Sequence, residues 1–164
     1  MTTIATSVEN AILADVVTAL ETIQSADSDY YSDPRRVYQM FGNVMELSEK
    51  PCIVVAPLPS EGSHDCPNGL ERINMRLSVT CVMDATGDGF MDDDWAETAM
   101  QIRNMASDIR RALQLDLKRG SRAIDTIIES TDVFDAVQGN PLAAAEVVVS
   151  IPFRHRTADP TQAF

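Results

Sequence analysis

The feature of this sequence that most constrains its fold is a strict alternation of apolar and polar residues over residues 73–81. Successive side chains of an extended strand point to opposite faces, so this period of two predicts a strand with one buried face. Since Cys81 belongs to the apolar set, we expect it to be a small core residue. The apolar members are Ile73, Met75, Leu77, Val79 and Cys81.

Two longer segments have the spacing of amphipathic helices. Apolar residues recur at intervals of three or four from Thr3 to Ser25 and again from Trp95 to Leu117. The second segment follows aspartates at 92–94, which suit a helix N-terminus. Gly120 stands where a helix stop is expected.

Further strands are predicted at residues 50–57, 122–131 and 145–153, where β-branched and apolar side chains gather. Residues 33–41 fit either a short helix opened by a proline or a strand, and residues 58–68 are expected to form an exposed loop.

These elements together predict an α+β fold. We expect a single four-stranded, mostly antiparallel sheet with two long amphipathic helices packed on one face. The chain has 164 residues, 45% of them hydrophobic, which suffices for one core. We therefore expect one α+β domain over residues 1–153, followed by a polar C-terminal arm over residues 154–164.

Charge and composition narrow the classes of function. With 25 acidic and 13 basic residues the formal charge is −12, which disfavours binding to duplex nucleic acid or to an anionic membrane surface. We expect neither a membrane span nor an export signal, because the sequence has no long apolar run. Three cysteines without paired spacing argue against a disulfide framework and favour a reducing compartment.

The loop at residues 84–94 partly matches a calcium-binding loop when Gly89 takes the glycine position. Trp95 stands where such a loop needs a bidentate glutamate, and a turn followed by a helix cap accounts for the same residues. The ligands of this alternative would be Asp84, Thr86, Asp88 and Asp92.

The residues for a zinc site or a catalytic site are weakly patterned. The set Cys52, His64, Cys66 and Cys81 lacks the paired short spacing of zinc sites. The sequence has neither a nucleophile elbow nor a phosphate-binding glycine loop. We therefore expect no enzyme, no metal and no cofactor, and a small acidic enzyme or calcium module remains only as an alternative.

Basic residues concentrate on the second predicted helix and the turn after it. Six of the 13 lie there, which fits either a solvated helix face or an electrostatic contact with an acidic neighbour such as another copy. The ending Phe153-Arg-His-Arg-Thr-Ala-Asp-Pro160 fits either a frayed terminus or a docking arm. The predicted subunit-interface residues are Arg103, Arg110, Arg111, Arg119, Arg122, Phe153, Arg154 and Arg156.

Four stretches give the chain a resemblance to the tail terminator proteins of tailed bacteriophages. They are the opening helix at residues 12–23; Tyr31 to Pro34 with Lys50-Pro-Cys-Ile-Val-Val55; the strand–loop–helix passage at residues 72–117; and Ala143-Ala-Ala-Glu-Val-Val-Val-Ser-Ile-Pro-Phe-Arg154 with Asp159-Pro160. Related head–tail joining and neck proteins share this order and pattern of segments. The resemblance implies no catalytic residue.

The resemblance implies a small subunit of the virion tail or neck, assembled in the host cytoplasm as a ring of about six copies. Such a ring caps the tail tube protein, ends tube polymerisation and docks on the head connector or stopper protein. DNA passes through its lumen without specific binding. In the terminator ring the basic helix and the arginine-rich ending would supply the contacts between copies. A neck or head-completion protein is the alternative.

Overall fold

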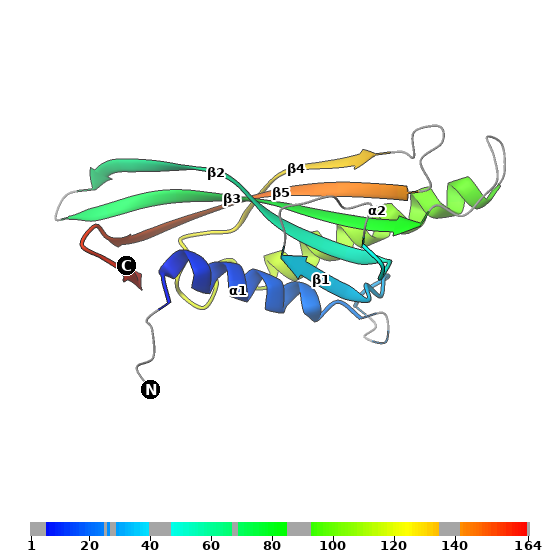
Figure 1. Ribbon diagram of the computed structural model, residues 1–164, viewed down its shortest axis with the longest axis horizontal. Coiled ribbons are helices and arrows are strands. Elements are labelled where there is room, and N and C mark those ends of the chain that lie inside the picture. Colours follow the sequence, from blue (N-terminus) through cyan, green and yellow to red (C-terminus); the bar gives the residue numbers. More distant parts are fainter. Residues whose placement is uncertain are drawn as a thin grey trace.

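The computed structural model describes residues 6–24, 26, 29–39, 47–66, 69–84, 93–134 and 142–163, without the side chains of residues 63–66 and 93–95. Figure 1 shows long strands lying side by side, with both helices along one side of them. The elements in chain order are α1 (Val8–Glu21), β1 (Arg36–Gln39), β2 (Cys52–Cys66), β3 (Leu70–Asp84), α2 (Asp93–Gln114), β4 (Ile127–Phe134), β5 (Leu142–Arg156) and β6 (Asp159–Ala163).

The strands form one six-stranded sheet in the order β1-β2-β3-β5-β4, and β6 also pairs with β5. β1 runs parallel to β2, whereas every other pair is antiparallel. The predicted fold class is therefore wrong. Over the described residues the sheet is mixed and has six strands instead of four, and α2, with 22 residues against 14 in α1, is the only long helix.

The strands that the sequence left open or missed lack a periodic signal. β1, with only four residues, confirms the strand alternative for residues 33–41, and the unpredicted β6 (Asp-Pro-Thr-Gln-Ala) has no apolar alternation. β6 exists because its ends pair with His155 and Arg156 at the end of β5. The predicted arm at residues 154–164 thus begins inside β5 and contains β6.

Most of the predicted loop at residues 58–68 is strand, because β2 continues to Cys66. Pro57 and Pro59 favour a loop over a strand when the sequence is considered alone. β1 pairs only with residues 52–55 of β2, so the outer edge of β2 beyond that point has no strand partner among the described residues. Prolines are tolerated on such an edge, because no ladder hydrogen bond is lost there.

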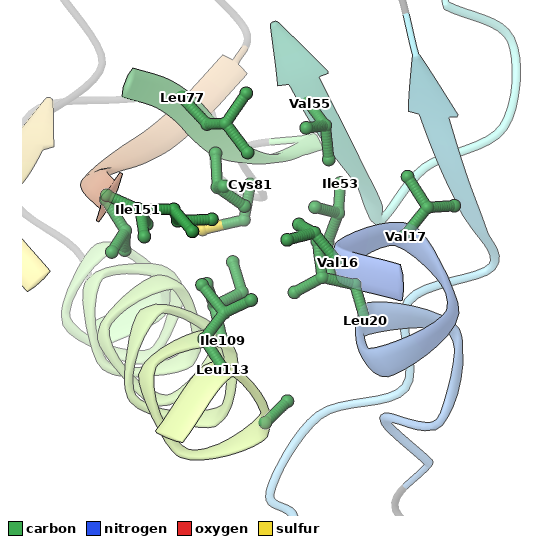
Figure 2. Packing of buried hydrophobic residues seen from close by; sticks show 14 of the residues in the cluster. Val16, Val17, Leu20, Ile53, Val55, Leu77, Cys81, Ile109, Leu113 and Ile151 are labelled. Atoms are coloured by element: carbon green, nitrogen blue, oxygen red, sulfur yellow. The ribbon is translucent and has the colours of Figure 1, made fainter. Parts of the chain in front are cut away.

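The alternation at residues 73–81 is confirmed as part of β3, and its apolar members face the helices. Figure 2 shows Ile109 and Leu113 of α2 on the side of Ile151, whereas Leu20 of α1 lies next to Ile53 of β2. α2 thus covers the β3–β5 side of the sheet, and α1 covers the β2–β1 side. One apolar core fills the space between the two layers.

The opposite face of the sheet carries a small apolar cluster of Cys52, Val82 and Leu142. Towards the middle of this face the side chains are polar and bonded across strands. The Ser78 hydroxyl donates to Glu146 Oε1, and the Ser150 hydroxyl donates to Asn74 Oδ1 at 2.5 Å. Half-buried polar groups are stable here because each finds a partner.

Candidate functional site

The exposed flank of α2 carries two of the predicted interface residues whose charged ends have no contact with other described residues. Arg103 and Arg110 are exposed, and no contact joins either guanidinium to another described residue. They are seven residues apart, so they lie on one stripe of the helix, and Gln114 continues the stripe four residues on. We call these three residues the basic flank of α2.

A shallow surface hollow of about 310 Å³ adjoins the basic flank. Residues of α2 line it together with Leu115, which follows the helix and is 72% exposed. The hollow combines cationic groups with an exposed leucine, which is the mixture expected where a protein partner docks. Its lining residues are Ser107, Arg110, Arg111, Gln114 and Leu115.

Arg111 is committed to a contact within its own chain. Its Nη2 lies 3.0 Å from Asp29 Oδ1, Nη1 donates to the Asp29 carbonyl oxygen at 2.8 Å, and the guanidinium lies over the Tyr30 ring. Asp108, buried on the same helix, accepts from the N–H groups of Tyr31 and Ser32 at 3.0 and 2.8 Å. α2 therefore fixes the segment that follows α1.

Arg119 lies inside the subunit, with 0% of its surface exposed. Its guanidinium donates to the Leu113 carbonyl oxygen, to Thr126 Oγ1 at 3.1 Å and to Asp15 Oδ2 at 3.5 Å. Burial lowers the pKa of the Arg119 guanidinium, while Asp15 opposes that shift. Arg119 thus joins the end of α2 to α1 and to the approach to β4 instead of reaching a neighbour.

The turn around Arg119 is held by Asp116. Its carboxylate accepts from the Gly120 N–H at 2.7 Å and from the Lys118 N–H at 2.9 Å, which holds the pKa of this carboxyl below its usual range. Arg119, Gly120 and Ser121 all have positive φ angles, of 47°, 62° and 67°. Only the glycine adopts this conformation without strain, so these bonds stabilise an unfavourable turn.

The other predicted interface residues are spread over the molecule. Arg122 is exposed in the turn after α2, while Phe153 is 1% exposed and belongs to the core. Arg154 and Arg156 are exposed near the end of β5, on the helix-free face. The structure brings Arg103 and Arg110 together on one flank and separates them from the arginines of β5. The subunit interface itself stays a prediction.

The calcium interpretation falls mostly outside the described residues, since only Asp84 of its four ligands is described; that carboxylate lies 3.2 Å from Lys50 Nζ. Of the proposed zinc set, Cys52 and Cys81 are buried free thiols. Burial raises the pKa of both, that of Cys81 to about 12. Within the described ranges no cluster of histidine, cysteine and carboxylate side chains could hold a metal ion.

The sequence interpretation overlooked the polar network on the helix-free face. Arg76 there donates to Glu129 on β4 at 2.7 Å, across the intervening strand β5. The signal was present, because the polar members of the alternation at residues 73–81 mark that face. Their partners on other strands could not be read from one strand alone.

Comparison with protein-family models gives no match for this chain, and a search of curated proteins gives no matching sequence. Among the described helices, none combines the length and the apolar character that crossing a membrane requires. The surfaces described above and the sequence resemblance are therefore what bears on the function of this chain.

Proposed function

We propose that this chain is a structural virion protein, a tail terminator that assembles into a closed ring at the end of the tail tube. The ring would stop tube polymerisation and offer a face to the head connector. The sequence resemblance supports the tail end as the place of action, and the surface of the subunit supports the assembly.

The observation that carries the proposal is the basic flank of α2 on a strongly acidic chain. Arg103 and Arg110 keep exposed guanidinium groups although the chain carries a formal charge of −12. A chain with many carboxylates has ample means to pair these cations internally, as it does for Arg76 and Arg111. Cations left free beside an exposed leucine favour contact with an acidic partner, and another copy of the chain is such a partner.

The net charge also suits a ring through which DNA passes. A ring of six copies would carry a formal charge of about −72, six times that of one chain. Like charge repels the phosphate backbone, so DNA would slide through the lumen without binding to its wall.

The test is tube growth. Purified tail tube subunits would be polymerised with and without this protein, and tube lengths and tube ends would be measured by negative-stain electron microscopy. We expect shorter tubes with a ring-shaped density at one end. Tubes of unchanged length with bare ends would contradict the proposal.

Co-sedimentation distinguishes the neck or head-completion alternative. A terminator should pellet with purified tubes, whereas a neck protein should pellet with DNA-filled capsids and leave the tubes bare. Binding to capsids alone would favour the neck or head-completion protein over the tail terminator.

A further inference from the structure

The sheet ends on both sides in a strand with a single partner. Among the described residues β4 pairs only with β5 and β1 pairs only with β2, so each has one edge without a strand neighbour. An unpaired edge offers a row of N–H and C=O groups to another strand. The regular part of β4, residues 130–134, contains no proline, unlike the outer edge of β2 at Pro57 and Pro59.

The strand directions fit two copies placed side by side. β1 and β5 run in the same direction, because β1 is parallel to β2 and two antiparallel steps lead from β2 to β5. β4 is antiparallel to β5, so β4 and β1 run in opposite directions. A second copy in the same orientation therefore brings its β1 antiparallel to β4 of the first, which is the more stable pairing.

The charges at the two edges of the sheet are opposite. β4 carries Glu129 and Asp132 and no basic residue. β1 begins with Arg36 and follows Arg35, both exposed; Arg36 contacts Glu49 at 3.4 Å yet leaves 59% of its side chain exposed. Asp132 lies opposite Glu146 on the helix-free face, and Arg36 lies opposite Cys52, which faces the same way.

The helix layer shows the reverse arrangement of charge on the same two sides. α2 lies on the β4 side with its basic flank. Asp108 faces the segment that follows α1, because it accepts a hydrogen bond from that segment. Arg110 lies two positions later, about 200° further around the helix. The basic flank therefore points away from α1. α1 packs against β1 and also contacts β6, and it contains no basic residue. Glu9 and Glu21 are exposed, whereas Asp15 is turned to Arg119.

We propose that β4 and the basic flank of α2 of one copy dock against β1 and α1 of the next copy. This inference rests on the proposed ring function and names the surfaces that close the ring. Acidic strand meets basic strand in the sheet layer, and basic helix meets acidic helix in the helix layer. The contact also covers the exposed Ile127 and Phe134 of β4. Two different surfaces meet, so the contact is head-to-tail, the kind that forms a ring when the rotation from copy to copy closes.

The test uses two single charge reversals, Asp132→Lys on the β4 side and Arg36→Glu on the β1 side. Each variant alone should lose the ring, because every contact would join like charges. An equimolar mixture should recover a ring of alternating variants, because the β4 side of each variant then meets a β1 side of opposite charge on the other. The chain carrying both reversals should recover the ring. Native mass is read by light scattering on a sizing column.

Arg72→Glu is the matched control, because Arg72 is an exposed arginine on the inner strand β3 and lies on neither side. The control should assemble as the unmodified chain does. Far-UV circular dichroism and a thermal melt show whether each variant is folded, and the neutral variants Asp132→Asn and Arg36→Gln replace any reversal that is not. The neutral variants should weaken the association of copies into the ring by a smaller factor than the charge reversals do.

The outcomes separate the two proposals. If the unmodified chain forms rings and both reversals also do, the docking surfaces are wrong while the ring function stands. If mixing the two variants does not recover the ring, the head-to-tail contact is wrong. If the unmodified chain joins only at tube ends, the same variants are scored there by recruitment, which single reversals should abolish and the double reversal restore. A chain that is monomeric in solution and absent from tube ends overturns both.

Discussion

Arg119 and Asp15 join the two helices of this subunit from inside. Arg119 Nη1 lies 3.5 Å from Asp15 Oδ2, and the guanidinium, fully buried, also caps the carbonyl end of α2 at Leu113. The carboxylate is about a third exposed, so water shares in its solvation. The pair therefore links the two helices, and its main stabilising effect comes from the bonds that Arg119 makes to buried oxygens.

Replacing Arg119 should destabilise the fold. In Arg119→Leu the Leu113 carbonyl and Thr126 hydroxyl lose their donors, so we expect a loss of about 2–4 kcal/mol in the free energy of unfolding. Urea denaturation measures it. Arg110→Leu is the control, since that exposed arginine should change stability by less than about 0.5 kcal/mol. Equal effects of the two variants would contradict the role given to Arg119.

Asp108→Ala should release the segment that follows α1. The variant removes the acceptor of the Tyr31 and Ser32 N–H groups and of the Ser32 hydroxyl, which donates at 2.5 Å. We expect a loss of about 2–3 kcal/mol, because these bonds involve a charged acceptor. Limited chymotrypsin digestion should cut faster at Tyr31, which is 74% exposed. Ser107→Ala is the control, and an unchanged cleavage rate in Asp108→Ala would contradict the assignment.

Cys81 should make the fold sensitive to alkaline pH. Burial raises the pKa of its thiol to about 12 from an ordinary value of 9.0, so between these values the unfolded chain loses a proton that the folded chain keeps. Stability therefore falls as pH rises above about 9, by about 1.4 kcal/mol at pH 10 from this group.

The measurement compares urea denaturation of the unmodified chain and Cys81→Ala from pH 8 to pH 10.5. The variant starts lower because it leaves a small cavity, but its stability should fall less steeply with pH. Parallel curves would show that Cys81 does not titrate differently in the two states.

The parts of the fold that the sequence predicted are those with a long periodic pattern. α1, α2, β3 and β5 each present apolar residues to one core at the period of their own geometry. β1 and β6 are too short for a period, and their existence depends on β2 and β5 as pairing partners. The prolines of β2 are tolerated only because its outer edge is unpaired there, which is a property of the whole sheet.

The candidate site was predictable only in part, for a similar reason. A charged side chain is expected at the surface by default, which suits Arg103 and Arg110. Arg119 departs from that rule because oxygens from α1, α2 and the approach to β4 surround its guanidinium. No local sequence pattern predicts that these oxygens meet. The opposite charges of β1 and β4 became visible only when the strand order placed them at the two ends of one sheet.

The most direct test of the central claim is the native mass of the purified protein, measured by light scattering on a sizing column with negative-stain images of the peak. We expect a closed ring of about six copies, either in solution or when tail tubes are added. A particle of 18.0 kDa in solution that also fails to bind tube ends would contradict the claim.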